Sequence, residues 1–259
     1  MTEQKQTFWD HLDVLRAALI RVALVFVVVA VAAFCFKEQL FALMTAPQSS
    51  DFCFYRWLNA LLALLPGSVD AVDSFSVRIV NTQLAGQFLL HMRMAMYVAV
   101  LIILPYIMFE LFRFASPGLY QKERSVACRV LLSAYVMFML GVVMSYLIVF
   151  PLTFRFLGTY QVMEEVDNLI TLESYLGTLT SLNLMLGIVF ELPVLCWLLG
   201  KTGLLTADLL RNYRRHAIVI LMILAAIITP TADIFTLLIV TLPMYLLFEF
   251  GIFVVAHSR

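Results

Sequence analysis

The sequence predicts an all-α, polytopic membrane protein with six transmembrane helices. Hydrophobic residues make up 63% of the chain and charged residues only 13%, and the mean hydropathy of +0.97 lies far above that of a soluble domain. Several apolar runs reach the roughly 20 residues that a helix needs to cross a hydrocarbon core of about 30 Å. A turn-forming segment at 229–233 separates the last two runs.

The chain is expected to form a single membrane domain over 1–259. Its first element is an amphipathic helix at 7–16, in which Phe8, Leu12 and Leu15 recur at helical spacing. This helix is expected to lie along the membrane interface before the chain turns inward. Spans are expected at 17–36, 94–111, 130–154, 175–199, 217–228 and 234–256. The fifth and sixth helices are expected to be short, with a re-entrant hairpin buried in protein as the alternative.

The long segment 37–92 is expected to be a structured extracytoplasmic loop. The apolar run 57–65 is too short to span and ends at Pro66 and Gly67, which suits a helix on the outer surface. Alternation at Phe75, Val77 and Ile79 gives a weak strand signal.

The distribution of charge predicts the orientation. Basic and acidic residues number 17 each, so the net charge says nothing about partners. With both termini in the cytoplasm, 12 of the 17 Lys and Arg residues fall on the cytoplasmic side, as the positive-inside rule requires. The four cysteines lack metal spacing, and no metal, cofactor or nucleic acid is expected to bind. Cleavage of the first span as a signal peptide is disfavoured, because its apolar stretch continues past the candidate site.

One carboxylate lies deep in an apolar run. Glu191 falls within 184–199, and Thr180, Asn183 and Gly187 precede it at helical spacing, so one helix face is polar. A charge at mid-bilayer depth costs about 2.5–3.5 kcal/mol, so this face is expected to meet a protein interior or a wet cavity. The alternative is a neutral carboxyl that serves packing alone. For Glu249, near the end of the last span, a structural interfacial role is the favoured alternative.

Six motifs occur in order along the chain. They are HLDVLR at 11–16, Ala46-Pro47, FRFASPGLYQKER at 112–124, FELP at 190–193, the turn at 229–233, and LPMYLLFE at 242–249. Together they resemble the TatC family, the multispanning receptor subunit of the bacterial twin-arginine protein translocase. Each motif alone is weak, but six in register on a six-span chain are a specific match.

The resemblance implies a non-enzymatic role in protein transport. A TatC-like protein of the bacterial cytoplasmic membrane would bind signal peptides with paired arginines and help move folded proteins across by the proton-motive force. The implied peptide-binding residues are Glu123, Asp10, Asp13, Arg16, Phe114, Pro117, Leu119 and Tyr120. Glu123 is the first choice, because carboxylates pair bidentately with guanidinium groups. Its alternative is neutralisation of the neighbouring Lys122 and Arg124 on a solvated loop.

The resemblance also implies intramembrane polar positions and partners. The intramembrane positions are Glu191, Asn183, Thr180 and Glu249, and Pro47 and Asp233 are structural or partner-contacting positions. Single-span TatA/TatB-type subunits, the bilayer and further copies in an oligomer are the implied partners.

The chain departs from the family pattern at two positions. Val14 stands where the family has a second acidic contact, and Leu237 stands where it has a polar residue for partner subunits. Asp10 is one turn from position 14 and about 40° away around the helix, whereas Asp13 is about 100° away. Geometry therefore favours Asp10 as the relocated acid.

Two rival classes of protein fit the sequence less well. A proton-coupled small-solute transporter would use Glu191 and Glu249 as a relay, but no repeat links the two halves of the chain. An intramembrane enzyme would need a catalytic motif, and HExxH, GxSxG and His/Cys clusters are all absent from the sequence.

Overall fold

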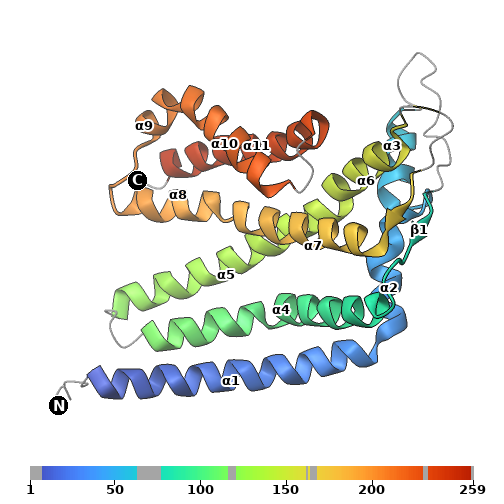
Figure 1. Ribbon diagram of the computed structural model, residues 1–259. Coiled ribbons are helices and arrows are strands. Elements are labelled where there is room, and N and C mark those ends of the chain that lie inside the picture. Colours follow the sequence, from blue (N-terminus) through green and yellow to red (C-terminus); the bar gives the residue numbers. More distant parts are fainter. Residues whose placement is uncertain are drawn as a thin grey trace. The chain divides into compact units, whose positions relative to one another are not determined.

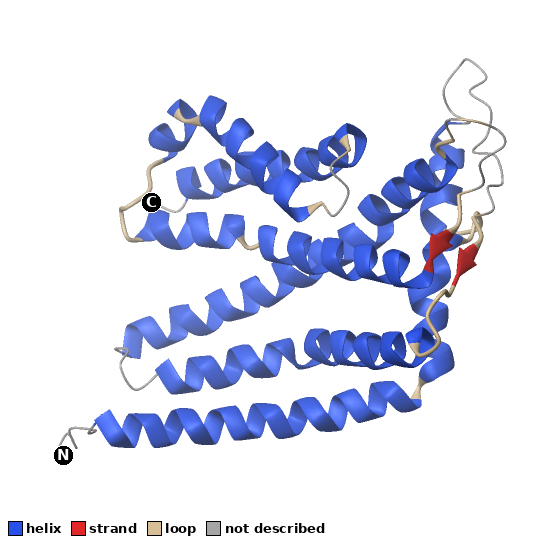
Figure 2. Cartoon of the chain, in the orientation of Figure 1, coloured by secondary structure: helices blue, strands red, loops and turns tan. Residues whose placement is uncertain are grey.

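Helices account for nearly all of the structure, as the composition predicts (Figures 1 and 2). The computed structural model describes residues 8–62, 77–115, 121–161, 163, 168–229 and 233–257. The chain separates into two compact units. Unit 1 comprises Met1–Leu40 and Phe88–Tyr135, and unit 2 comprises Phe41–Gln87 and Val136–Arg259.

Unit 1 is built on two long helices, α1 (Phe8–Cys35) and α4 (Gly86–Ala115), followed by the first part of α5 (Gln121–Met144). α1 has no glycine or proline across its 28 residues, so nothing interrupts it. The amphipathic segment and the first span are therefore one continuous helix, without the expected turn between them. α1 and α4 run antiparallel, because Arg21 pairs with Glu110 near one end and Phe34 stacks on His91 near the other.

Unit 2 contains the remaining elements. In chain order these are the end of α2 (Lys37–Thr45), η1 (Ala46–Gln48), α3 (Cys53–Leu62), β1 (Ile79–Val80), the end of α5, η3 (Ser145–Val149), α6 (Phe150–Thr159), β2 (Ile170–Thr171), α7 (Leu172–Val189), α8 (Leu192–Lys201), α9 (Ala207–Asn212), α10 (Arg214–Ile228) and α11 (Ile234–His257). η3 is a single π-helical turn between α5 and α6, a widened turn of the kind often found at functional sites.

The core of unit 2 depends on a close approach of α7 to α5. A Cβ on Gly141 would lie 2.7 Å from the Leu186 carbonyl oxygen, and one on Gly187 would lie 2.8 Å from the Phe138 ring. Side-chain carbons do not approach other atoms so closely, so only glycine fits at these positions. Leu182 and Leu186 beside this contact are fully buried.

The segment between α2 and α4 is structured where it is described. β1 pairs in parallel with β2, with Ile79 opposite Ile170. α3 is held by the buried Tyr55, whose hydroxyl donates to the Pro151 carbonyl over 2.8 Å. Of the positions behind the weak strand signal, Ile79 lies in β1, Val77 lies before it, and Phe75 lies outside the described residues. The partner strand β2 was not predicted, because two residues carry no periodicity.

The helix lengths identify a multi-pass membrane protein. Within the described residues, five stretches are long and apolar enough to cross a bilayer, namely Leu12–Cys35, Gly86–Phe114, Cys128–Thr159, Leu172–Lys201 and Ile234–His257. α10 has 15 residues, which is about 22 Å of helix against a core of about 30 Å, so the short fifth helix is confirmed. α11 has 24 residues, so the sixth helix is not short: its apolar sequence continues to the end.

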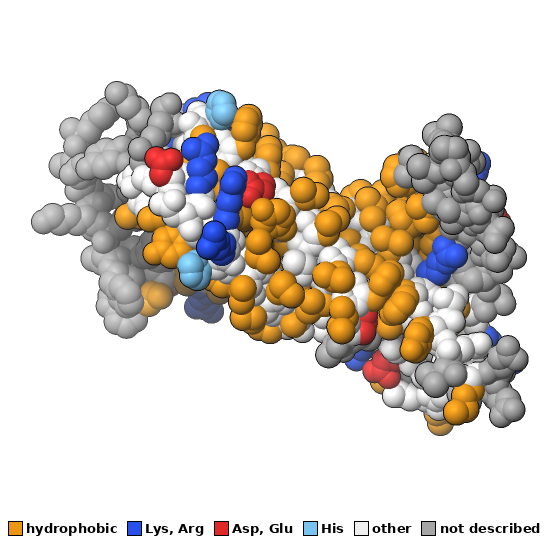
Figure 3. Space-filling model, turned by 90° about the horizontal axis from the view of Figure 1, so that it is seen from above, with side chains coloured by type: hydrophobic (Ala, Val, Ile, Leu, Met, Phe, Trp, Pro, Cys, Tyr) orange, Lys and Arg blue, Asp and Glu red, His pale blue; other side chains and the backbone are white. Residues whose placement is uncertain are grey.

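The surface agrees with these lengths. Hydrophobic side chains cover the middle of the face over α10 and α11, and charged side chains gather toward its ends (Figure 3). This is the arrangement that a hydrocarbon layer between two aqueous phases selects.

Candidate functional site

Unit 1 collects the positions expected to bind a signal peptide. These are Asp10, Asp13, Arg16, Phe114, Pro117, Leu119, Tyr120 and Glu123. Asp13 and Arg16 are exposed on α1, and Phe114 is half-buried near the end of α4. Positions 10 and 123 lie in α1 and in the first turn of α5, but their side chains, and residues 116–120, lie outside the described part of the chain. Three helical segments that carry these positions therefore belong to one compact unit.

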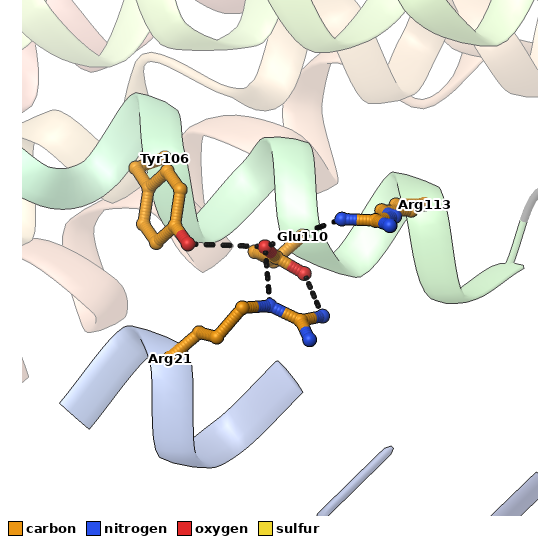
Figure 4. A network of polar contacts seen from close by, with 4 residues as sticks. All are labelled: Arg21, Tyr106, Glu110 and Arg113. Atoms are coloured by element: carbon orange, nitrogen blue, oxygen red, sulfur yellow. Dashed lines mark hydrogen bonds and ion pairs between the residues drawn. The ribbon is translucent and has the colours of Figure 1, made fainter. Parts of the chain in front are cut away.

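Sequence reasoning missed a buried carboxylate in the same unit. Glu110 on α4 is only 3% exposed. Arg21 of α1 donates to both of its carboxylate oxygens, from Nε over 3.0 Å and from Nη2 over 2.8 Å. The Tyr106 hydroxyl donates to Oε1 over 3.0 Å, and Arg113 Nη1 lies 4.0 Å from the same oxygen (Figure 4).

This network neutralises a charge that would be costly alone. A two-pronged guanidinium–carboxylate pair is the strongest form of such a contact. Removing Arg21 would leave the Glu110 carboxylate without its main compensating charge. The sequence held a usable signal: Arg21 is a lone charge in an apolar run, and Tyr106 and Glu110 are four residues apart on one helix face.

A second network, with one glutamate, one tyrosine and one arginine, lies in unit 2. Tyr245 and Glu249 are four residues apart on α11, and the tyrosine hydroxyl donates to Oε1 over 3.0 Å. Arg214, at the start of α10, donates to Oε2 over 2.7 Å. This ion pair ties α10 to α11. The geometry is that of the structural interfacial carboxylate weighed for Glu249 in the sequence.

Glu191 lies at a break between α7 and α8. Its backbone N–H donates to the Ile188 carbonyl over 3.1 Å, a tight turn that ends α7. Pro193 causes the break, because its ring has no N–H and clashes with the carbonyl four residues earlier. The Glu191 side chain is half-buried.

The polar residues before Glu191 are mostly packed inside unit 2, the first of the two surroundings expected for this face. Asn183 is 3% exposed, and the Thr180 hydroxyl donates to the Leu176 carbonyl of its own helix over 2.9 Å. Ser145 on η3 is fully buried, and neither its Oγ nor the Asn183 Oδ1 has a hydrogen-bond partner among the described residues. Because Gly141 lies against Gly187 and the helices run antiparallel, Ser145 is level with Asn183.

Other features have local roles. Pro47 is buried in η1, and the Asp233 Oδ1 accepts the Thr236 N–H over 2.7 Å, which caps α11. A cavity of ≈ 400 Å³ between α6, β2 and α7 has no charged side chain in its lining, so it does not suit a guanidinium ligand. No group of three His, Cys, Asp or Glu side chains in the described ranges could hold a metal ion.

Comparison with known proteins decides the family. The sequence profile of Sec-independent protein translocase protein (TatC) matches residues 10–243. The chain belongs to the TatC family. Among its relatives, the TatC protein of Blattabacterium sp. subsp. Periplaneta americana is 29% identical over 255 residues, covering 97% of this chain and 96% of the relative. The TatC protein of Deinococcus radiodurans is 32% identical over 249 residues, covering 94% and 83%.

Solved structures agree with this assignment. The crystal structure of the twin arginine translocase receptor TatC matches with a TM-score of 0.68 at 27% identity, covering 95% of this chain and 97% of that one. The structure of that receptor in DDM gives a TM-score of 0.69, with 94% and 98% covered. This TatC chain is thus a multi-pass membrane component of the twin-arginine protein transport system. The family match supports a translocase over a small-solute transporter, and TatC is not an enzyme family.

Proposed function

We propose that the chain is the receptor that binds twin-arginine signal peptides at the cytoplasmic face and helps move folded proteins across the bacterial cytoplasmic membrane. The site comprises the start of α1, the end of α4 and the start of α5. Glu123 is its principal contact for a guanidinium group, and Asp10 or Asp13 supplies a second carboxylate in place of the acid missing at Val14. Phe114, Pro117, Leu119 and Tyr120 shape the connection between α4 and α5.

One observation carries this proposal. The segments that hold these residues, separated by about half of the sequence, belong to the same compact unit. Asp13 on α1 is exposed and can accept hydrogen bonds from an incoming arginine. Position 123 lies in the first turn of α5, where unpaired backbone N–H groups favour a carboxylate. Paired guanidinium forks need carboxylates on more than one segment, and unit 1 supplies them.

A peptide titration tests the proposal. The full-length protein in lipid nanodiscs is titrated with a signal peptide that carries paired arginines and with a paired-lysine version. The wild type is expected to prefer the arginine peptide. Glu123→Ala should lose about tenfold or more of its affinity and most of that preference, because the bidentate contact is gone.

The control is Asp208→Asn, which removes an exposed carboxylate on α9 in unit 2. It should keep both the affinity and the preference. Equal wild-type affinity for the two peptides contradicts the proposal.

We further propose that single-span TatA/TatB-type subunits pack beside α10. This helix is too short for an unperturbed bilayer, so the membrane must thin around it. Val219, Ile223 and Ile227 are spaced by four residues and are 55–73% exposed, which leaves one apolar face open. Ile223→Trp should reduce co-purification of such a subunit. Unchanged co-purification would place the contact elsewhere.

A further inference from the structure

We propose that the Arg21–Glu110 ion pair is a positioning device for the signal-peptide site. It fixes the rotation and the axial register of α1 against α4, and thereby the direction in which positions 10 and 14 face beside the end of α4. Arg21, Glu110 and Tyr106 act through this geometry and do not contact the peptide. The inference rests on the proposed function and adds the means by which its two segments are held together.

α1 is otherwise weakly held. Only 6% of its most apolar stretch is buried, and Ala18 is its only buried side chain among those described. At the far end, Phe34 stacks on His91 with 3.9 Å between ring centroids. Apolar and stacking contacts tolerate rotation and sliding, whereas a two-pronged ion pair demands one orientation.

The ion pair fixes the rotation of α1 about its axis, and therefore the direction in which positions 10 and 14 face. At 100° per residue, position 14 is about 20° from Arg21 around the helix, and position 10 is about 20° away on the other side. Ala18, about 60° away, is buried, whereas position 14 itself is 43% exposed. Asp13 is about 80° away. The ion pair thus fixes the direction in which positions 14 and 10 of α1 face, and it leaves position 14 accessible to a ligand.

The residues of α4 that face the ion pair continue along one helix face toward the end of α4. Tyr106, Glu110 and Phe114 are spaced by four residues and share one helix face. Because the helices are antiparallel, the path from Arg21 toward position 10 runs alongside the path from Glu110 toward Phe114. One turn, about 6 Å, separates Glu110 from Phe114, so a rotation of α1 would move positions 10 and 14 away from the site.

The charge of the network favours positioning over direct contact. Arg21 and Arg113 outnumber the single carboxylate of Glu110, so the group is net positive and repels a guanidinium. Both oxygens of Glu110 already accept bonds from Arg21. A carboxylate in this state holds a helix in place and leaves peptide binding to the acids nearer the helix ends.

The test uses the same nanodisc titration with paired-arginine and paired-lysine peptides. Glu110→Gln and Arg21→Gln should each weaken binding of the arginine peptide about tenfold. The charge-reversed double variant, Arg21→Glu with Glu110→Arg, should restore affinity to within about threefold of the wild type. The control is Glu249→Gln, because Glu249 likewise pairs with an arginine and a tyrosine but on other helices; its peptide affinity should be unchanged.

Distinct results overturn the inference. Tighter binding by Arg21→Gln would make Glu110 a direct peptide contact that Arg21 blocks. Unchanged affinity in both single variants, with Glu123→Ala still defective, would limit the ion pair to stability. If Glu123→Ala also binds normally, the proposed function fails and not merely the positioning. If Glu110→Gln does not accumulate in membranes, Arg21→Lys replaces it, because lysine keeps the charge but cannot donate from two nitrogens. Arg21→Lys is expected to lose less peptide affinity than Arg21→Gln. Wild-type peptide affinity in Arg21→Lys contradicts the positioning role of the ion pair.

Discussion

At the scale of single residues, three glutamates in apolar helices have different surroundings. Glu110 is 3% exposed and clamped by Arg21, and Glu249 is held by Arg214 at a helix end. Among the described residues, no arginine or tyrosine side chain pairs with Glu191, which lies at a backbone break. In a low-dielectric layer, the neighbouring side chains determine the role of a carboxylate. A carboxylate that is paired with an arginine holds two helices together, whereas one without such a partner can serve a functional role.

Glu191 is expected to matter for transport more than for folding. Glu191→Ala should reduce export of a twin-arginine cargo severalfold while the membrane level of the protein stays near that of the wild type, because no buried ion pair is broken. Glu191→Gln, which keeps the shape and the hydrogen-bonding capacity, is the matched control and separates polarity from charge. Export and immunoblotting of the same membranes measure both quantities. A parallel fall in protein level would assign Glu191 to packing.

Tyr55 is expected to make stability depend on alkaline pH. Burial raises the pKa of its phenol, against a smaller opposite effect of the Arg155 charge. The folded state therefore holds this proton more tightly than the unfolded chain, so its contribution to stability is complete below about pH 10 and declines as the pH rises further. Tyr55→Phe should lose about 1 kcal/mol of unfolding free energy at neutral pH, since the bond to Pro151 is lost, and should show a flatter alkaline decline.

Thermal unfolding of the detergent-solubilised protein across this pH range measures the effect. Tyr160→Phe, at an exposed position after α6, is the control. An unchanged alkaline slope in Tyr55→Phe would show that another group titrates.

At the scale of elements, interruptions in the helices set the packing. α1 is continuous because it lacks glycine and proline. The helical segment formed by α7 and α8 bends at Pro193, and the π-helical turn η3 widens the helix between α5 and α6 opposite α7. Gly141 and Gly187 let α5 and α7 approach closely between these irregularities. Unit 2 is therefore shaped by where its helices deviate from regular geometry, and Glu191 lies at one of those points.

Two glycines of α7 provide a matched pair of substitutions. Gly187→Ala should lower the unfolding free energy by about 1–3 kcal/mol, because the new methyl would meet the Phe138 ring. Gly177→Ala, where no atom lies within 4 Å of the added carbon, should raise it by about 0.5–1 kcal/mol through helix propensity. Chemical unfolding in mild detergent measures both values. Equal effects of the same sign would mean that α7 does not pack on α5 as described.

At the scale of the whole molecule, the two units divide the proposed tasks. Unit 1 contains the segments assigned to peptide recognition, and unit 2 contains Glu191, the short α10 and the second arginine–glutamate clamp. Both clamps follow one pattern, a Tyr and a Glu four residues apart with an arginine from a neighbouring helix. In a bilayer, where hydrophobic association between helices is weak, such polar fasteners can specify which helices pair.

The orientation of the whole chain gives a prediction of its own. Both termini are expected in the cytoplasm, because most Lys and Arg residues then face it. Green fluorescent protein fused to either terminus should fluoresce, and alkaline phosphatase fused there should be inactive. The control is a phosphatase fusion after residue 81, between the first two long helices, which should be active. An active phosphatase at the C-terminus would reverse the orientation and move the proposed site to the wrong side.

The class of protein, the order of the spans and the family can be read from the sequence, because apolar run length and short motifs are local properties of the chain. The sequence also indicated the positive-inside orientation and the break signal at Pro193. Which polar residues meet is known only from the folded molecule. Arg21 and Glu110 are 89 positions apart, and Ser145 and Asn183 lie on different helices, so no local pattern relates them. Contacts of this kind depend on how helices rotate and pack, which a single sequence does not encode in its periodicity.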